Sequence, residues 1–277
     1  FPFFFVFLTC ALPILNPMDL DLSTDVGESP MLMQADFLLS QCELMMASYG
    51  NPLMPIEKSL IDRCISLVYR DYLKNPRPEN MPVLGDLYQC LREQHNSRAD
   101  DLATAMEIYV TGSLSYLNHR TNVDLNNRMV CYNTSKLGQG LKKLVMSNVQ
   151  KHIWQRTAVN RYAGITTRIF LDEFHLLLKE PQTAAYTAEI YKRFRKWNGI
   201  PTSLTQNVKD LLDSSEIENI LENSDFVLML NQVASDRNIL AQRLGISPQE
   251  LSQDRNSTRL NSRHEWKSKA GFSLKKK

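Results

Sequence analysis

Residues 168–174 read RIFLDEF, a short apolar run that ends in two adjacent acids. The run at 167–171 is rich in residues that favour extended structure and predicts a β-strand. A helix is predicted at 184–197, where apolar side chains recur on one face, and a second strand at 200–205, IPTSLT. A strand, a helix and a strand in this order predict a parallel βαβ unit with a right-handed crossover.

The same alternation continues on both sides of this unit. Residues 128–132 (RMVCY) and 226–230 (FVLML) predict two more strands. Residues 137–153, with apolar side chains at steps of four, predict a long amphipathic helix. Because the predicted strands are continuous apolar runs, we expect a sheet covered by helices on both faces. Shorter helices are predicted around 208–212, 216–222 and 236–244, the last ended by Gly245.

Residues 31–118 show helical periodicity and carry no chemical motif of their own. The segment 75–82, NPRPENMP, holds three prolines and is predicted to be a loop, as is 118–122, NHRTN. The predicted fold class is therefore α/β, a parallel sheet flanked by helices, with an all-helical subdomain inserted at 31–118. The predicted core comprises residues 14–30, as a remnant strand and loop, and residues 119–252.

Composition limits the possible functions without identifying one. The 277 residues have a formal net charge of +2, which gives no overall electrostatic case for binding nucleic acid or a membrane. Five scattered cysteines, with no CxxC, argue against a disulfide framework or a structural zinc site and suit a reducing cytoplasm.

The two ends differ from the middle of the chain. Residues 1–13 lie in an apolar run too short to span a bilayer, and 253–277 are polar, basic and unpatterned. We expect both ends to be non-native, because the tail is similar to translated sequencing-adapter sequence. A disordered basic tail and a membrane-touching start are the alternatives.

The acidic pair at the end of the first strand is the main candidate site. The carboxyl ends of parallel strands face the crevice in which open α/β sheets bind ligands. Asp172 is placed to hold Mg²⁺ there, because a hard cation prefers oxygen ligands, and Glu173 to orient or activate an attacking water. The alternative is an ordinary helix N-terminus, where acids are favoured by unpaired amides.

Gln206 follows the next predicted strand and is a candidate sensor of a nucleotide's terminal phosphate. Polar residues at strand ends also cap helices, and Asn207 is such a candidate cap. The functional interpretation becomes more specific when Gln206 is considered with the acidic pair on the neighbouring strand.

A basic stretch at 191–197, YKRFRKW, lies between the two strands. Arg193 or Arg195 is a candidate arginine that acts in trans at a subunit boundary, where it would stabilise charge on a transferring phosphate. The alternatives are a solvated ion pair between Glu189 and Arg193 at i,i+4, and contact of the same basic face with a DNA backbone.

Other chemistries find little support in the sequence. His175 has no second group of metal ligands nearby, so a packed or capping histidine is predicted. No GxSxG elbow is present, and no GxxxxGK[ST] phosphate loop occurs among the 277 residues.

Residues 14–252 resemble the motor ATPases of conjugative transfer and type IV secretion. The stretches that carry the resemblance are LNPMD (15–19), YVTGSLSYLNHRTNVD (109–124), LDEFHLLLKEPQTAAY (171–186), YKRFRKWNGIPTSLTQNVKDLL (191–212) and ENSDFVLMLNQ (222–232), with IDRC and LVYRDYL (within 61–73). The resemblance implies a RecA-like core that binds ATP and Mg²⁺ and assembles as a homo-hexamer. It also implies a position in the cytoplasm, peripheral to the inner face of the bacterial membrane, with partners in the secretion channel.

By position, Asp172 and Glu173 match the family's Walker B acids, and Gln206 matches the glutamine of the next strand. Asp172 and Gln206 are then the nucleotide-binding residues, and Asp172 the metal ligand. The resemblance places the phosphate loop upstream of LNPMD, so we expect the sequence to begin after this loop and to be inactive by itself. Two alternatives remain: a related RecA-like DNA pump or coupling ATPase, and a non-catalytic scaffold with a degenerate ATPase fold.

Overall fold

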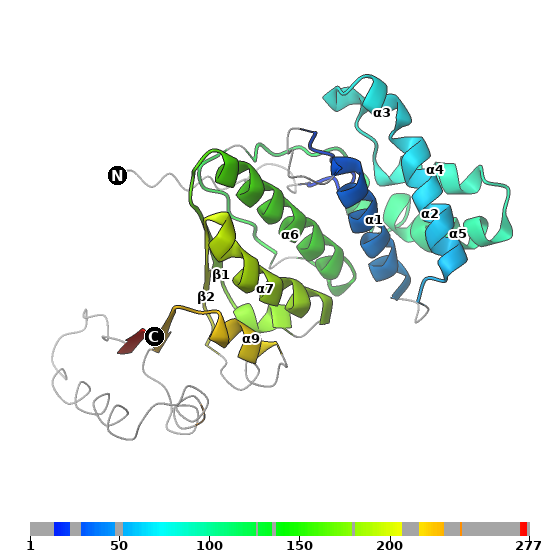
Figure 1. The fold of residues 1–277 in the computed structure, drawn as a ribbon. Coiled ribbons are helices and arrows are strands. Elements are labelled where there is room, and N and C mark those ends of the chain that lie inside the picture. The colour runs from blue at the N-terminus through cyan, green and yellow to red at the C-terminus, as the bar shows by residue number, and fades with distance from the viewer. Residues whose placement is uncertain are drawn as a thin grey trace. The chain divides into compact units, whose positions relative to one another are not determined.

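The structure, a computed structural model, describes residues 14–22, 29–47, 52–125, 127–134, 137–178, 181–206, 216–229, residue 239 and the strand 272–275. The chain divides into two compact units, Phe1–Val159 and Asn160–Lys277 (Figure 1). The division falls inside the long helix α6 (Gln139–Tyr162), so the last residues of this helix belong to the second unit. Within the described residues, no helix has both the length and the apolar character needed to cross a bilayer.

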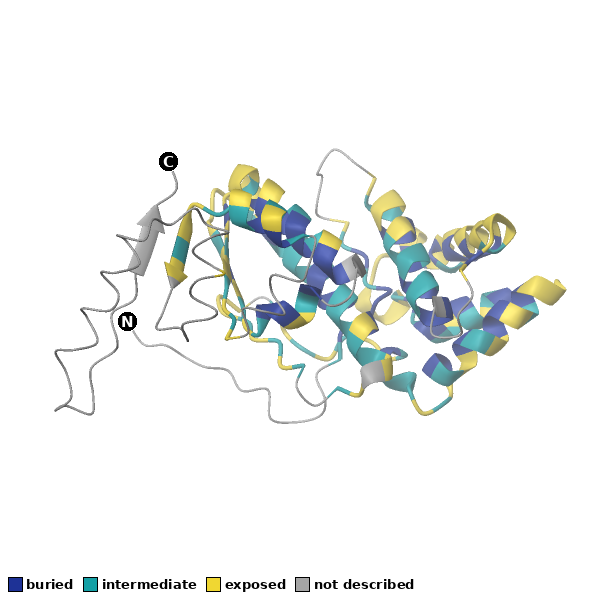
Figure 2. Cartoon of the chain, turned by 90° about the horizontal axis from the view of Figure 1, so that it is seen from below, coloured by how far each residue is buried: buried dark blue, intermediate teal, exposed yellow. Residues whose placement is uncertain are grey.

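The first unit is helical, as predicted. Its helices are α1 (Pro30–Ala47), α2 (Pro55–Val68), α3 (Arg70–Lys74), α4 (Leu84–Arg92), α5 (Ser97–Val110) and most of α6, with short 3₁₀ helices η1 (Pro78–Asn80) and η2 (Ser115–Leu117). One face of each of α2, α4 and α5 is buried (Figure 2). These faces meet in a single apolar cluster whose fully buried members include Leu38, Ile61, Leu87 and Met106.

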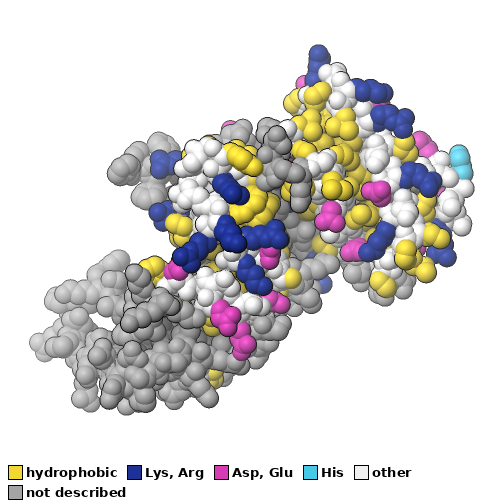
Figure 3. Space-filling model, in the orientation of Figure 1, with side chains coloured by type: hydrophobic (Ala, Val, Ile, Leu, Met, Phe, Trp, Pro, Cys, Tyr) yellow, Lys and Arg dark blue, Asp and Glu magenta, His cyan; other side chains and the backbone are white. Residues whose placement is uncertain are grey.

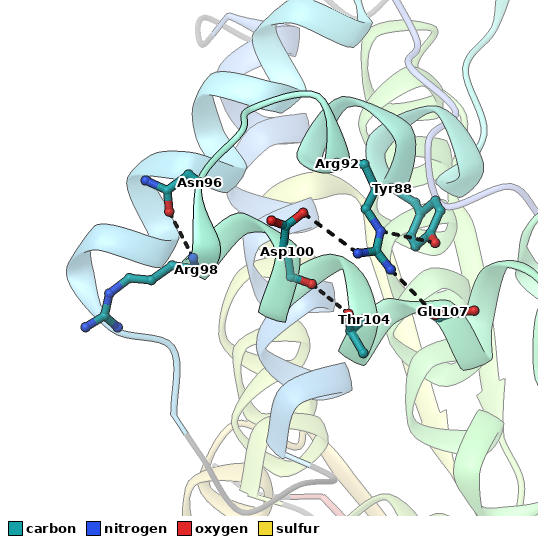
Figure 4. A network of polar contacts seen from close by, with 7 residues as sticks. All are labelled: Tyr88, Arg92, Asn96, Arg98, Asp100, Thr104 and Glu107. Atoms are coloured by element: carbon teal, nitrogen blue, oxygen red, sulfur yellow. Dashed lines mark hydrogen bonds and ion pairs between the residues drawn. The ribbon is translucent and has the colours of Figure 1, made fainter.

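Polar contacts fix the corner between α4 and α5 (Figure 4). The Asn96 side chain caps α5 by accepting a hydrogen bond from the Arg98 backbone N–H at 2.9 Å. Arg92 of α4 donates to the Tyr88 hydroxyl at 3.3 Å and lies 3.7 Å from carboxylate oxygens of both Asp100 and Glu107 on α5. These ion pairs are partly exposed, so they set the register of the two helices more than they add stability.

The LNPMD segment, predicted to be a remnant strand, forms a turn instead. No neighbouring strand is described here, and side chains of the helices bind its backbone carbonyls. Asn148 of α6 donates to Leu15 O at 2.7 Å, and Lys151 donates to Asp19 O at 2.6 Å. Gln34 and Tyr69 donate to the carbonyls of Pro17 and Met18. The segment is thereby attached to α1, α6 and the α2–α3 junction.

The predicted βαβ unit is confirmed in the second unit. Strands β1 (Thr167–Leu171) and β2 (Gly199–Ser203) are parallel, with Thr167 opposite Gly199 and Leu171 opposite Ser203. The connection comprises η3 (Phe174–Leu178), α7 (Pro181–Arg193) and η4 (Phe194–Trp197). Figure 1 shows α7 lying along the two strands. Apolar side chains of η3, α7 and α9 (Ile217–Glu222) form the core beneath them.

Two predicted strands differ from the structure. Residues 128–132 are not a strand, because they find no partner among the described residues and Met129 and Cys131 are exposed. β3 (Phe226–Met229) forms as predicted but does not join β1 and β2. It pairs antiparallel with β4 (Phe272–Lys275), which lies in the tail expected to be unpatterned.

The predicted cover by helices on both faces of the sheet is not seen within the described residues. Phe170, Ile200 and Leu204 are 69%, 42% and 46% exposed, and the burial along β1 alternates. Among the described elements, helices cover one face of β1 and β2, and these exposed side chains lie on the other face. The predicted helices at 208–212 and 236–244 lie outside the described residues, apart from residue 239.

Candidate functional site

A tight turn carries the two predicted acids directly after β1. Glu173 has a φ of 47°, a left-handed conformation that is uncommon for a residue with a side chain. The turn is supported on both sides: Asp172 Oδ1 accepts the Glu173 N–H at 2.9 Å, and Glu173 O accepts the Leu176 N–H at 2.9 Å. A left-handed conformation that local hydrogen bonds hold in place is a form of backbone strain that is frequent at functional sites.

The pairing of the two strands continues past their ends and places Gln206 beside this turn. Leu204 N–H donates to Leu171 O, and Phe174 N–H donates to Leu204 O, both at 2.9 Å. Three residues from Ser203, the Gln206 Nε2 donates to Glu173 Oε1 at 3.1 Å. The structure therefore brings Glu173 and Gln206 together at the carboxyl ends of two adjacent parallel strands.

His175 contacts the same group from the protein interior. Its residue is 8% exposed, and its Nδ1 lies 3.0 Å from Thr205 Oγ1 and 3.4 Å from Glu173 Oε2. A packed or capping histidine was predicted, and the burial agrees. The contact with Glu173 was not predicted, because the spacing of the two residues in the sequence does not show that η3 orients the His175 ring toward the Glu173 carboxylate.

The strand ends fit a divalent cation only as part of a larger ligand set. Asp172 is exposed, and one of its carboxylate oxygens accepts a backbone hydrogen bond. Among the described residues, no group of three or more His, Cys, Asp or Glu is arranged to hold a metal ion. Mg²⁺ is commonly bound through one or two carboxylates together with water and substrate phosphates, so Asp172 suits that mode and not a closed protein site.

The arginines lie at the other end of the unit. Arg193 ends α7 and pairs with Glu189, the ion pair given above as the alternative to a role in trans. Arg195 lies in η4 with its side chain 84% exposed, 3.8 Å from Asp225. Because η4 leads into the start of β2, both arginines are near the amino ends of the strands. The structure does not bring them to Asp172, Glu173 and Gln206 of the same chain.

Further basic side chains gather at this amino end. Lys192, Lys196 and Arg161 are exposed, and the Arg161 guanidinium lies 4.8 Å from the centre of the Trp197 ring. Figure 3 shows Lys and Arg side chains clustered over the region of α7. The chain carries a net charge of only +2, so this cluster is a local concentration of positive charge.

The βαβ unit, with polar residues at its strand ends, is of the kind found in α/β domains that bind ligands at the carboxyl ends of parallel strands. Residues 82–266, more than half of the sequence, match the TraG P-loop domain, and the chain belongs to this family. The resemblance to motor ATPases of conjugative transfer and type IV secretion is thereby confirmed, and nucleotide binding is a property of the class. No protein with a curated description matches the sequence.

A solved structure agrees with this assignment at the level of the fold. VirB4 of Thermoanaerobacter pseudethanolicus superimposes with a TM-score of 0.67 at 19% identity, over 88% of this chain and 67% of that chain. At this identity the likeness concerns the fold alone, and it confirms the predicted α/β, RecA-like class.

Proposed function

We propose that the chain is part of the catalytic core of an ATP-hydrolysing motor that powers conjugative DNA transfer or assembly of a type IV secretion machine. The observation that carries the proposal is the 3.1 Å hydrogen bond between Gln206 and Glu173 at the carboxyl ends of β1 and β2. In this proposal Asp172 holds Mg²⁺, Glu173 orients the attacking water, and Gln206 responds to the terminal phosphate.

The site can be tested on the chain itself with Mn²⁺ in place of Mg²⁺. In the presence of ATP, bound Mn²⁺ should broaden the backbone amide NMR signals of Glu173 and Gln206. Asp172→Asn should abolish this broadening, whereas Asp71→Asn, which removes an exposed carboxylate of α3, should leave it unchanged. Equal broadening in both variants would contradict the assignment.

Hydrolysis by this polypeptide alone is expected to stay at background. The 277 residues contain no GxxxxGK[ST], so the loop amides and the lysine that surround the β- and γ-phosphates are not supplied. Phosphate release with Mg²⁺ and ATP measures this. Magnesium-dependent turnover that is abolished by Glu173→Gln and retained in Glu222→Gln, an exposed acid of α9, would overturn the expectation.

The motor itself is tested on a longer product of the same gene. A GxxxxGK[ST] motif encoded upstream of Leu15 supports the motor, and its absence from the whole gene would favour the scaffold alternative. In the longer product, Glu173→Gln should abolish turnover and leave nucleotide binding in place, because Glu173 acts on water rather than on the nucleotide.

We further propose a homo-hexamer in which Arg193 or Arg195 serves the site of a neighbouring subunit. The supporting observation is their position at the amino ends of the strands, away from the acids of their own chain. The proposed location is cytoplasmic, at the inner face of the membrane, in contact with channel components. Co-sedimentation of the longer product with membranes, lost when the channel components are deleted, tests that location.

Contact with DNA is a second candidate property of the same basic cluster. The exposed Lys192 and Lys196, and Arg161 stacked on Trp197, are the groups that would meet a phosphate backbone. Fluorescence anisotropy of a labelled single strand measures this binding. Lys192→Glu with Lys196→Glu should weaken it, whereas Arg63→Glu with Arg70→Glu, an equal change of charge in the first unit, should not. Equal weakening would indicate attraction by net charge alone.

A further inference from the structure

We propose that His175 is a positioning residue that holds the Glu173 carboxylate through the Nδ1–H form of its ring. The proposal rests on the role of Glu173 given under the proposed function, and it adds a residue to that site. His175 does not contact the reacting groups in this arrangement; it acts through Glu173.

The two oxygens of the Glu173 carboxylate face side chains of two different segments. Oε1 accepts from Gln206, which follows β2, and Oε2 faces Nδ1 of His175 on η3 at 3.4 Å. The carboxylate is 43% exposed, whereas the His175 side chain is 11% exposed. Glu173 therefore reaches toward solvent while one of its oxygens is held from the buried side.

The ring is fixed well enough to act as a support. His175 is buried within η3, and Nδ1 also lies 3.0 Å from Thr205 Oγ1, in the segment that leads to Gln206. One ring nitrogen thus contacts both strand-end segments. A carboxylate in a left-handed turn would otherwise be free to rotate about its side-chain bonds, so this contact reduces the number of orientations that Glu173 samples.

The chemistry of the three groups selects one form of the ring. An ionised carboxylate only accepts hydrogen bonds, whereas the Thr205 hydroxyl donates or accepts. A proton on Nδ1 is therefore compatible with both neighbours: it can hydrogen-bond to Thr205 Oγ1 at 3.0 Å, and its positive partial charge lies 3.4 Å from Glu173 Oε2. With the proton on Nε2, the Nδ1 lone pair would face the carboxylate at 3.4 Å, which is repulsive. The geometry thus favours the Nδ1–H tautomer, the less common form of a free imidazole.

Two-bond ¹H–¹⁵N NMR of the ring nitrogens tests the assignment without nucleotide. At neutral pH, His175 should give the Nδ1–H pattern, and His95 and His119, which lie outside the site, serve as references in the same spectrum. Glu173→Ala should shift the His175 population toward Nε2–H. An Nε2–H pattern in the unsubstituted chain, or no change in Glu173→Ala, would overturn the proposal.

Substitution of the histidine separates positioning from packing. Asn places an amide N–H near the position of Nδ1, so His175→Asn should preserve the Gln206 side-chain amide signals, whereas His175→Leu should shift them toward those of Glu173→Ala. Equal shifts in the two His175 variants would refute a positioning role. If the tautomer is as expected but Asp172→Asn leaves the Mn²⁺ broadening at Gln206 unchanged, His175 still positions Glu173 and the proposed function fails instead.

Discussion

Asn16 offers the most direct test of how the first unit is held together. Its residue is fully buried; its Nδ2 donates to Pro82 O at 2.7 Å, and its Oδ1 accepts from Met18 N–H at 3.0 Å. Asn16→Ala removes both hydrogen bonds and leaves two buried backbone groups unsatisfied, each at a cost of about 1–3 kcal/mol. The free energy of unfolding should therefore fall by about 2–4 kcal/mol, allowing for partial relaxation of the turn.

Urea unfolding followed by circular dichroism at the helix band measures this loss, because most of the described helix belongs to the first unit. Asn127→Ala is the matched control: Asn127 also donates to a backbone carbonyl, that of Asp124 at 3.2 Å, but it is exposed. The control should change stability by less than about 0.5 kcal/mol. If Asn16→Ala unfolds at the same urea concentration as this control, the LNPMD turn does not depend on its buried side chains.

Two further predictions follow, one for each unit. Burial lowers the pKa of Lys151 from 10.5 to about 7, and the charge of Asp19 opposes this shift. Above pH 7 the unfolded state then binds more protons than the folded state, so the urea midpoint of unfolding should rise from pH 7.5 to 9. Lys151→Met should remove this rise. An equal dependence of the midpoint on pH in the variant would contradict the argument. In the second unit, a Cβ on Gly199 would lie 2.7 Å from Cδ2 of the buried Phe194. Gly199→Ala should lower the free energy of opening that hydrogen exchange measures in β1 and β2 by about 1–3 kcal/mol. Gly138→Ala, where the added methyl group meets open space, should leave this free energy unchanged. Equal protection of the strands in the two variants would refute the packing argument.

The parts of the fold that the sequence predicts are those specified by local signals. The run at 167–171 and the helix that follows it form as predicted, because apolar pattern and chain order together determine a parallel βαβ unit. The run at 128–132 has a similar composition and is not a strand. A strand depends on a partner, and composition alone does not reveal whether one is present.

The candidate site shows the same division between local and non-local information. That Asp172 and Glu173 follow a strand is visible in the sequence. The hydrogen bond from Gln206 to Glu173 depends on the register of β1 with β2. The order of elements in the sequence predicts that the strands are parallel neighbours but does not give this register. The contact of His175 with Glu173 depends on a residue at φ 47°, and nothing in the sequence marks a left-handed glutamate.

The position of the arginines is the strongest reason to expect that the proposed site is completed by another subunit. β1 spans five residues, about 15 Å, and the acids follow its carboxyl end, whereas Arg193 and Arg195 precede the amino end of its neighbour β2. Within one βαβ unit, a right-handed crossover returns the chain to the edge of the sheet opposite the ligand-binding crevice. In the proposed hexamer, Arg193 and Arg195, which lie at the end of this connection, would reach a phosphate bound at the carboxyl edge of another copy. Such a contact would be heterologous, and heterologous contacts that close form a ring, as the proposed homo-hexamer requires.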